Sequence, residues 1–220
     1  MQSTEPEEME EELEKKKSPL KYILAAVLVF ILVLMIIPYY GVKLDPRPSY
    51  TPTIEEVLPE NIILENQSHK VNSLNDFKKF VNPNDQIIRD IAVKIATSSC
   101  KKSKVCQAKA IYYFVRDNIK YVSDPHSLEY AETAKEVLIT GGSDCDGHVI
   151  LLMNLEESIG IKSRFVFIPQ HVYIQIYLPE ALKSYKSEDD WISLDATCKD
   201  CDFGEIPYQN LKKEKTYLEI

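Results

Sequence analysis

The sequence predicts an α+β domain preceded by one apolar helix, and three observations support this prediction. Residues 22–37 form an uninterrupted apolar and aromatic run. Between residues 84 and 160 the apolar positions recur at helical spacing, and beyond residue 163 they alternate every second position, as in strands. Helices first and an antiparallel sheet afterwards is the order of the α+β class.

The composition limits the kinds of partner. The chain has 220 residues, room for one ordinary domain and an appendage, and a formal net charge of −8. It contains no basic cluster of the kind that binds nucleic acid, so we expect no nucleic-acid partner. The composition gives no reason to expect a cofactor.

The N-terminal region predicts a membrane anchor. Residues 1–19 are highly charged and predict a disordered cytoplasmic tail, whereas residues 20–40 would span about 30 Å as a helix, the thickness of one bilayer core. Lysines crowd the N-terminal side of this helix, so the tail should be cytoplasmic and the remaining chain extracytoplasmic. Because no small-x-small cleavage site follows, we interpret residues 20–40 as an uncleaved signal-anchor in contact with lipid, which makes this a single-pass protein of the cell membrane.

Residues 41–83 contain five prolines and little periodicity. They predict an extracytoplasmic spacer that lifts the domain off the membrane, with room to pack partly on the surface of the domain. The tripeptide Asn66-Gln67-Ser68 is a glycosylation sequence, usable only if this side is extracytoplasmic.

The folded domain is predicted over residues 84–220. Helices are expected from an N-cap at Asp85, over residues 103–118, from a capping box at Thr133, and from Cys145 to a C-cap at Gly160. Strands are expected at 164–168, 171–178 and 191–195, the first two joined as a hairpin through Pro169 and Gln170. Such an arrangement packs N-terminal helices on an antiparallel sheet.

Cys145 stands where a glycine-rich loop turns into a helix. Three of the six glycines lie within residues 141–148, around this cysteine. The N–H groups and dipole of a helix start favour a thiolate, so we expect its pKa to lie below the ordinary value of about 8.5. The alternative is a small buried residue without chemistry. Asp144 and Asp146 should point away, because a neighbouring carboxylate raises a thiol pKa.

His171 and Asp195 are candidate partners for this thiol. If the last two predicted strands pair through their apolar faces, both residues lie on the same, more polar side of the sheet. With the helix of Cys145 over that side, its N-terminus would meet His171 and form the set used in nucleophilic catalysis. Each residue has a plain alternative: His171 as an ordinary strand residue and Asp195 as a turn residue. His148 is a rival base, although its position three residues after Cys145 suits packing better.

The order of these motifs resembles the transglutaminase-like superfamily, in a membrane-anchored microbial or archaeal form. The resemblance covers roughly residues 85–205 and consists of Gly-Gly-Ser-Asp-Cys-Asp-Gly-His with its helix, the strand that opens with His171, and the later Trp191-x-x-Leu-Asp-Ala-Thr. It implies a papain-like fold and a Cys145–His171–Asp195 triad. Ser143 and Val172 depart from the usual glycine and alanine.

The same resemblance implies attack of the thiolate on an amide of a protein or peptide substrate and a thioester intermediate. We expect hydrolysis, as by a protease, amidase or isopeptidase, of a surface protein or cell-wall peptide, while acyl transfer to an amine stays open. A catalytically silent module that binds or scaffolds at the cell surface is the alternative.

The four other cysteines form two close pairs, Cys100 with Cys106 and Cys198 with Cys201. Outside the cell we expect disulfides, either within each pair or between the pairs. A four-thiolate zinc site built from both pairs is the alternative, although the wider spacing of the first pair fits it poorly.

Overall fold

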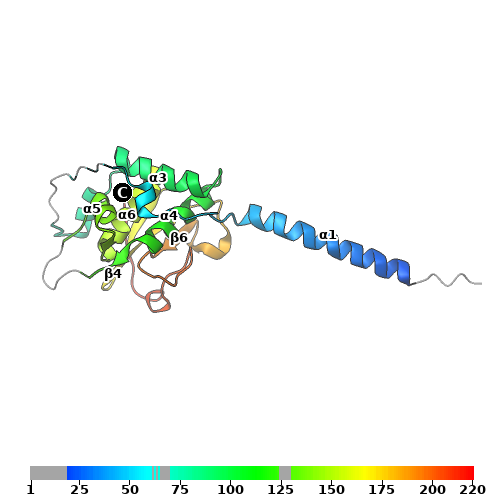
Figure 1. Cartoon of the computed structure of the whole chain (residues 1–220). Helices are drawn as coiled ribbons and strands as arrows, with labels where there is room; N and C mark the ends of the chain where they lie inside the picture. The colour runs from blue at the N-terminus through cyan, green and yellow to red at the C-terminus, as the bar shows by residue number, and fades with distance from the viewer. Residues whose placement is uncertain (1–18, 61, 63, 65–69, 124–129) are drawn as a thin grey trace, which may run out of the picture. The chain divides into compact units, whose positions relative to one another are not determined.

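The structure of the chain, a computed structural model, describes residues 19–60, 62, 64, 70–123 and 130–220 (Figure 1). The chain divides into two compact units, Met1–Gly41 and Val42–Ile220. The predicted tail at residues 1–18 and the glycosylation tripeptide at residues 66–68 lie outside the described residues.

Helix α1 (Leu20–Leu44) begins in the first unit. Its segment Leu20–Ile37 has a mean hydropathy of 2.9, and the side chains of this segment are exposed. By length and composition the helix is able to cross a membrane, and a signal sequence near the N-terminus has the same properties. The predicted span therefore coincides with a suitable helix, while its orientation stays a prediction.

Three long helices pack against one another in the second unit: α3 (Gln86–Ser99), α4 (Lys104–Asn118) and α6 (Cys145–Ser158). Local caps fix the first two. The predicted cap, Asp85, accepts a hydrogen bond from the Ile88 N–H at 3.1 Å, and Ser103, the predicted start of the second helix, accepts one from the Cys106 N–H at 3.3 Å. The shorter elements are α2 (Ile54–Val57), α5 (Ala134–Thr140) and the 3-10 turns η1 (Leu74–Phe80), η2 (Lys183–Tyr185) and η3 (Tyr208–Asn210).

Five strands form one antiparallel sheet in the order β5-β6-β4-β3-β7. They are β3 (Ser163–Ile168), β4 (His171–Tyr177), β5 (Lys186–Glu188), β6 (Trp191–Leu194) and β7 (Thr216–Glu219). A separate parallel pair joins β1 (Lys120–Tyr121) to β2 (Gly142–Ser143). The predicted α+β class is confirmed, and both edge strands, β5 and β7, escaped the sequence analysis.

Helix α6 covers the more apolar face of this sheet. It packs on β4 and β3, and its buried side chains share one core cluster with strand residues of that face, Phe165, Val172, Ile174 and Ile176. The other face has a small cluster of its own, made of Val166, Ile168, Tyr173 and Ile206. The expectation that α6 lies over the side of His171 and Tyr173 is therefore wrong, because burial of apolar area decides which face a helix covers.

The predicted spacer at residues 41–83 is in large part integral to the second unit. Val57, Phe77 and Phe80 are buried in the main core cluster. Asp45 forms an ion pair with Lys109, which is 2% exposed. The structure differs from the prediction here because a few buried side chains in a proline-rich segment leave no periodic pattern.

Both predicted cysteine pairs form disulfides, each within its pair. Cys100 is bonded to Cys106 with a Cα–Cα distance of 5.9 Å, and Cys198 to Cys201 with one of 5.3 Å. The zinc alternative for Cys100, Cys106, Cys198 and Cys201 is therefore wrong in this structure, since every sulfur of the two pairs is already bonded to another sulfur. Cys145 is the free cysteine.

Candidate active site

Cys145 is the first residue of α6, and the sequence around it explains this position. Helix α5 ends at Gly141, whose φ of 66° is a left-handed conformation that glycine adopts without strain. After β2, the Asp144 carboxylate caps α6 by accepting hydrogen bonds from the N–H groups of Asp146 at 2.9 Å and Gly147 at 3.3 Å. This cap does not use the N–H of Cys145 itself.

Gly147 permits a close approach of side chains beneath Cys145. A Cβ atom at this position would lie 1.9 Å from Ser143 Oγ and 2.7 Å from Glu132 Oε2. Ser143 donates a short hydrogen bond to that same Glu132 oxygen. The glycine after the Cys-Asp pair is therefore required by packing, and Ser143 has a defined partner.

Cys145 and His171 line the same open cleft, of about 580 Å³. Its walls are mostly apolar and come from three parts of the chain: residues 71–77, residue 131 and residues 167–172. A cleft of similar volume, about 540 Å³, lies at the other end of α6, and the described residues that line it include neither cysteine nor histidine. The first cleft is thus the candidate active site.

His171 is hydrogen-bonded to Asp195. Its Nε2 atom lies 2.8 Å from Asp195 Oδ2, and the aspartate side chain is 1% exposed. The register of β4 and β6 pairs Ile174 with Leu194, so Asp195 follows one step further, diagonal to His171 on the face opposite α6. Since a carboxylate only accepts, Nε2 carries the proton, and Nδ1 is left as the basic nitrogen.

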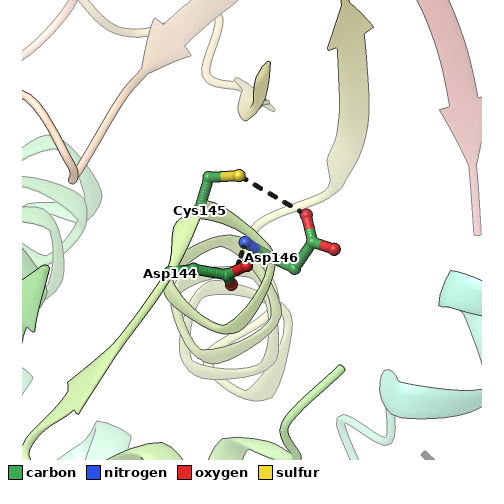
Figure 2. A group of neighbouring side chains, drawn as sticks. All are labelled: Asp144, Cys145 and Asp146. Carbon is green, nitrogen blue, oxygen red and sulfur yellow. Dashed lines mark hydrogen bonds between the residues drawn. The ribbon is translucent and has the colours of Figure 1, made fainter. Parts of the chain in front are cut away.

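Asp146 does not point away from the thiol, contrary to the sequence prediction. Its Oδ1 atom lies 3.6 Å from Cys145 Sγ as acceptor of the S–H, and Figure 2 shows this carboxylate turned toward the sulfur. The polar atoms of Asp144, Cys145 and Asp146 lie within 4.8 Å of one another. The helix cap and the S–H bond account for this proximity without a metal ion.

The thiol is protonated in this arrangement. Burial first, and then the negative charges of Asp146 and Asp144, raise the pKa of Cys145, and a hydrogen bond from the Val172 N–H partly opposes them. The net pKa is about 12. The predicted lowering of the Cys145 pKa is therefore wrong for this state, because burial and two carboxylates outweigh the helix terminus.

The rival base, His148, lies inside the core. It is 0% exposed, with Nδ1 2.7 Å from the Asp144 carbonyl and Nε2 3.3 Å from the Ile119 carbonyl. Burial lowers the pKa of His148, partly opposed by these two hydrogen bonds. His148 does not line the cleft with Cys145, so its role is structural.

Two features of the site escaped the sequence analysis. One is the cleft wall at residues 71–77, which the predicted spacer hid. The other is Thr197, whose side chain donates to Asp195 Oδ1 at 2.6 Å and whose N–H donates to it at 3.2 Å. The Asp-x-Thr spacing is the signal for such a turn, since aspartate commonly accepts from the residue two positions on.

Residues 89–196 match the model of the Transglutaminase-like superfamily, and this range contains Cys145, His171 and Asp195. Together with the mixed fold, the match identifies these residues as a core domain of that superfamily. No curated protein matches the chain.

Solved structures resemble the chain more distantly. A cysteine protease candidate of Cytophaga hutchinsonii is 18% identical with a TM-score of 0.42, over 64% of this chain and 47% of that one. Legionella pneumophila LapG is 14% identical with a TM-score of 0.44, over 76% of this chain and 83% of that one. The EGTA-treated form of LapG gives 14% identity and a TM-score of 0.43, over 76% and 81% of the two chains. The present chain spans about half the length of the Cytophaga protein.

Proposed function

We propose that this chain is a membrane-anchored thiol enzyme that breaks an amide or peptide bond through a thioester on Cys145. The observation that supports this most is the 2.8 Å bond between His171 and Asp195 beside the cleft that His171 shares with Cys145. A carboxylate that fixes the imidazole, and a thiol within the same cleft, are the parts of a nucleophilic triad.

The reaction follows from the proton positions. Nδ1 of His171 accepts the proton of the Cys145 thiol as Sγ bonds to the amide carbon, and the oxygen gains the charge. The Cys145 N–H, which the Asp144 cap leaves unused, supplies one donor to that oxygen. His171 then gives its proton to the departing amine as the C–N bond breaks, which leaves a thioester.

The second half of the reaction decides the product. Water, deprotonated by His171, attacks the thioester carbon, so that the acid is released and the proton returns to sulfur. An amine in place of water would give transfer instead. We favour hydrolysis, the expectation that the superfamily resemblance gave.

The cleft supports an apolar substrate group next to the scissile amide. Leu74, Phe77, Phe167 and Ile168 line it, and among the described residues no lysine or arginine does. The substrate class is therefore a protein or peptide with an apolar side chain at this site, and an extracytoplasmic surface or cell-wall peptide fits the predicted topology.

The catalytically silent module remains a second candidate because of one contact. Asp146 accepts the S–H of Cys145, and burial with this carboxylate raises the pKa of the thiol to about 12. A silent module would keep that state permanently. In an enzyme, His171 must be able to take this proton as Cys145 attacks an electrophile.

Alkylation of Cys145 by iodoacetamide separates the two candidates. In the enzyme, His171→Ala lowers the alkylation rate of the full chain near neutral pH by about tenfold or more, because the base is lost. Lys162→Gln, an exposed position directly before β3, is the matched control. A slow rate that His171→Ala leaves unchanged would favour the silent module.

Two further measurements test the reaction and the location. Incubation of the full chain with peptide amides, with and without an added amine, distinguishes acid from transfer products by mass. Alkaline carbonate extraction tests membrane anchoring, and protease treatment of sealed vesicles tests orientation. In sealed vesicles with the extracytoplasmic face outward, an extracytoplasmic second unit is cleaved directly. Cleavage of the second unit only after these vesicles are lysed would overturn the extracytoplasmic assignment.

A further inference from the structure

The two carboxylate oxygens of Asp195 have different partners. Oδ2 bonds to His171, while Oδ1 accepts from both the hydroxyl and the N–H of Thr197, at 2.6 and 3.2 Å. Thr197 therefore determines how the carboxylate is presented to the imidazole, although Thr197 itself does not line the cleft.

Two consecutive turns follow Asp195, and a disulfide closes the second of them. The Cys198 N–H donates to the Asp195 carbonyl at 3.2 Å, and the Cys201 N–H donates to the Cys198 carbonyl at 3.2 Å. The Cys198–Cys201 bond spans this second turn. Thr197 thus lies between a buried carboxylate on one side and a covalent link on the other.

The far end of this segment is fixed to helix α4. The Cys201 carbonyl accepts from Tyr112 Oη at 3.0 Å and from Arg116 Nη1 at 2.8 Å. Tyr112 Oη also lies 3.4 Å from the Asp195 carbonyl. Helix α4 and the disulfide therefore hold the turn at its end, and Asp195 holds it at its start.

The two disulfides of the chain differ in access. Cys100 and Cys106 are both buried, 6% and 4% exposed. Cys201 is 7% exposed, but Cys198 is half-buried and stands beside the exposed Lys199 and Asp200. Cys198 is thus the most exposed of the four bonded cysteines, and we expect a thiol from solution to attack this disulfide before the other.

We infer that Thr197 and the Cys198–Cys201 disulfide act together as a redox-sensitive brace of the Asp195 carboxylate. A dithiol reductant attacks Cys198, forms a mixed disulfide and closes to its own disulfide. Two electrons and two protons thereby pass to Cys198 and Cys201, which become thiols. The Cys198–Cys201 turn then loses its covalent closure, and the Asp195–Cys198 turn before it is released with it. Thr197 leaves Oδ1, and the carboxylate is no longer held against His171.

This brace makes oxidation a condition for activity. Its effect on turnover rests on the proposed function, because the loss of an oriented carboxylate lowers the reaction rate only if Cys145 and His171 are catalytic. Its effect on the bond between His171 and Asp195 does not depend on catalysis.

The bond itself is the primary readout. The chain has four histidines, so the imidazole N–H signal of His171 can be assigned by NMR of the full chain in detergent with a His171→Gln reference. We expect a solvent-protected Nε2–H signal in the wild type, in Thr197→Ser, which keeps the hydroxyl, and in the Cys100→Ala/Cys106→Ala control. The signal should be lost or exchange-broadened in Thr197→Val and in Cys198→Ala/Cys201→Ala.

A redox titration provides the second readout on the unmodified chain. Graded dithiothreitol, followed by mass analysis of the freed thiols, should reduce the His171 signal in proportion to reduced Cys198–Cys201 and independently of Cys100–Cys106. Over the same range, the His171-dependent alkylation of Cys145 should fall by about 10- to 100-fold, a part of what a general base supplies.

The outcomes are distinct. A protected His171 signal that persists in Cys198→Ala/Cys201→Ala, or after full reduction of this pair, overturns the brace. A signal that responds as expected while His171→Ala leaves alkylation unchanged supports the brace and overturns the proposed enzyme function.

Discussion

The Nε2 atom of His171 lies 2.8 Å from Oδ2 of Asp195, a residue 24 positions further along the chain. The pair is assembled by the antiparallel register of β4 and β6, on the sheet face that α6 does not cover. The Cys145 thiol comes from a different element, the start of α6. The three side chains therefore come together where the start of α6, the start of β4 and the end of β6 lie beside one cleft.

The contact between Asp146 and the thiol predicts a gain of reactivity on substitution. Burial and the charge of Asp146 are the largest causes that raise the pKa of Cys145, so Asp146→Asn should lower this pKa and increase alkylation at pH 7 to 8. Each unit of pKa corresponds to about a tenfold change in thiolate. The rate is measured with iodoacetamide across pH, with Asp189→Asn, an exposed carboxylate at the far end of β6, as control. A rate equal to or below the wild type would contradict the role assigned to Asp146.

Glu156 predicts an unusual dependence of stability on pH. It is 0% exposed, neither carboxylate oxygen has a hydrogen-bond partner among the described residues, and burial raises its pKa well above the ordinary value. The folded state thus keeps a proton that the unfolded chain releases above about pH 4.3, and stability falls as pH rises, by up to about 1.4 kcal/mol per unit. Glu156→Gln removes this slope.

The measurement is urea unfolding of the detergent-solubilised chain at pH 5 and pH 8, followed by the fluorescence of Trp191, the single tryptophan. We expect Glu156→Gln to gain stability over the wild type at pH 8 and little at pH 5. Exposed Glu180→Gln is the control. Equal slopes in the wild type and Glu156→Gln would mean that Glu156 ionises freely in the folded protein.

The pair of Lys109 and Asp45 predicts a loss of stability with a different pH dependence. Lys109 is 2% exposed, lies 3.1 Å from Tyr185 Oη, and pairs with Asp45, to which Tyr185 also donates at 2.8 Å. Burial raises the pKa of Asp45, but the bonds from Lys109 and Tyr185 outweigh it and lower the pKa overall. Lys109→Met should cost about 3 kcal/mol at pH 7, since it leaves a partly buried carboxylate without its cation.

Because the folded pKa of Asp45 is lowered, the stabilisation is complete above the unfolded value of about 3.9 and is lost as pH falls through the folded value. The difference between wild type and Lys109→Met should therefore shrink below about pH 4. Lys162→Met removes an exposed pair with Glu219 and should cost at most about 1 kcal/mol. A cost at Lys109 no larger than at Lys162 would reject the buried ion pair.

Gly147 predicts a steric defect that a second substitution relieves. In Gly147→Ala the new Cβ would meet Ser143 Oγ at 1.9 Å, so we expect a loss of about 1 to 3 kcal/mol in unfolding free energy. Ser143→Gly in the same chain should recover part of it, while the neighbouring Glu132 oxygen at 2.7 Å keeps the rescue incomplete. Additive costs of the two substitutions would show that Ser143 is not the obstacle.

Local signals made part of the fold predictable from the sequence. Capping is a contact between neighbours, so Asp85, Ser103 and Thr133 each mark a helix start that the structure has. Alternation places His171 and Asp195 on one side of the sheet, because side chains change sides at every strand residue. The glycine-rich approach to Cys145 likewise predicts a helix that begins at the cysteine.

Features that depend on distant packing were not predictable. Tyr173, Val166 and Ile168 give the second sheet face a buried cluster of its own, so the pattern alone does not decide which face α6 covers. Strand β7 pairs with β3 across some fifty residues, and no local pattern links the two. The rotamer that turns Asp146 toward Cys145, and the burial that keeps the thiol neutral, are also consequences of tertiary structure.

A sulfur that keeps its hydrogen is slow to react with peroxide, because the anion is the species that oxidants attack. By the same chemistry it is slow to exchange with the two disulfide bridges of its own chain. The carboxylate beside Cys145 thus protects the resting thiol from oxidation and from exchange with the bridges. Under the proposed mechanism this protection ends when His171 takes the proton.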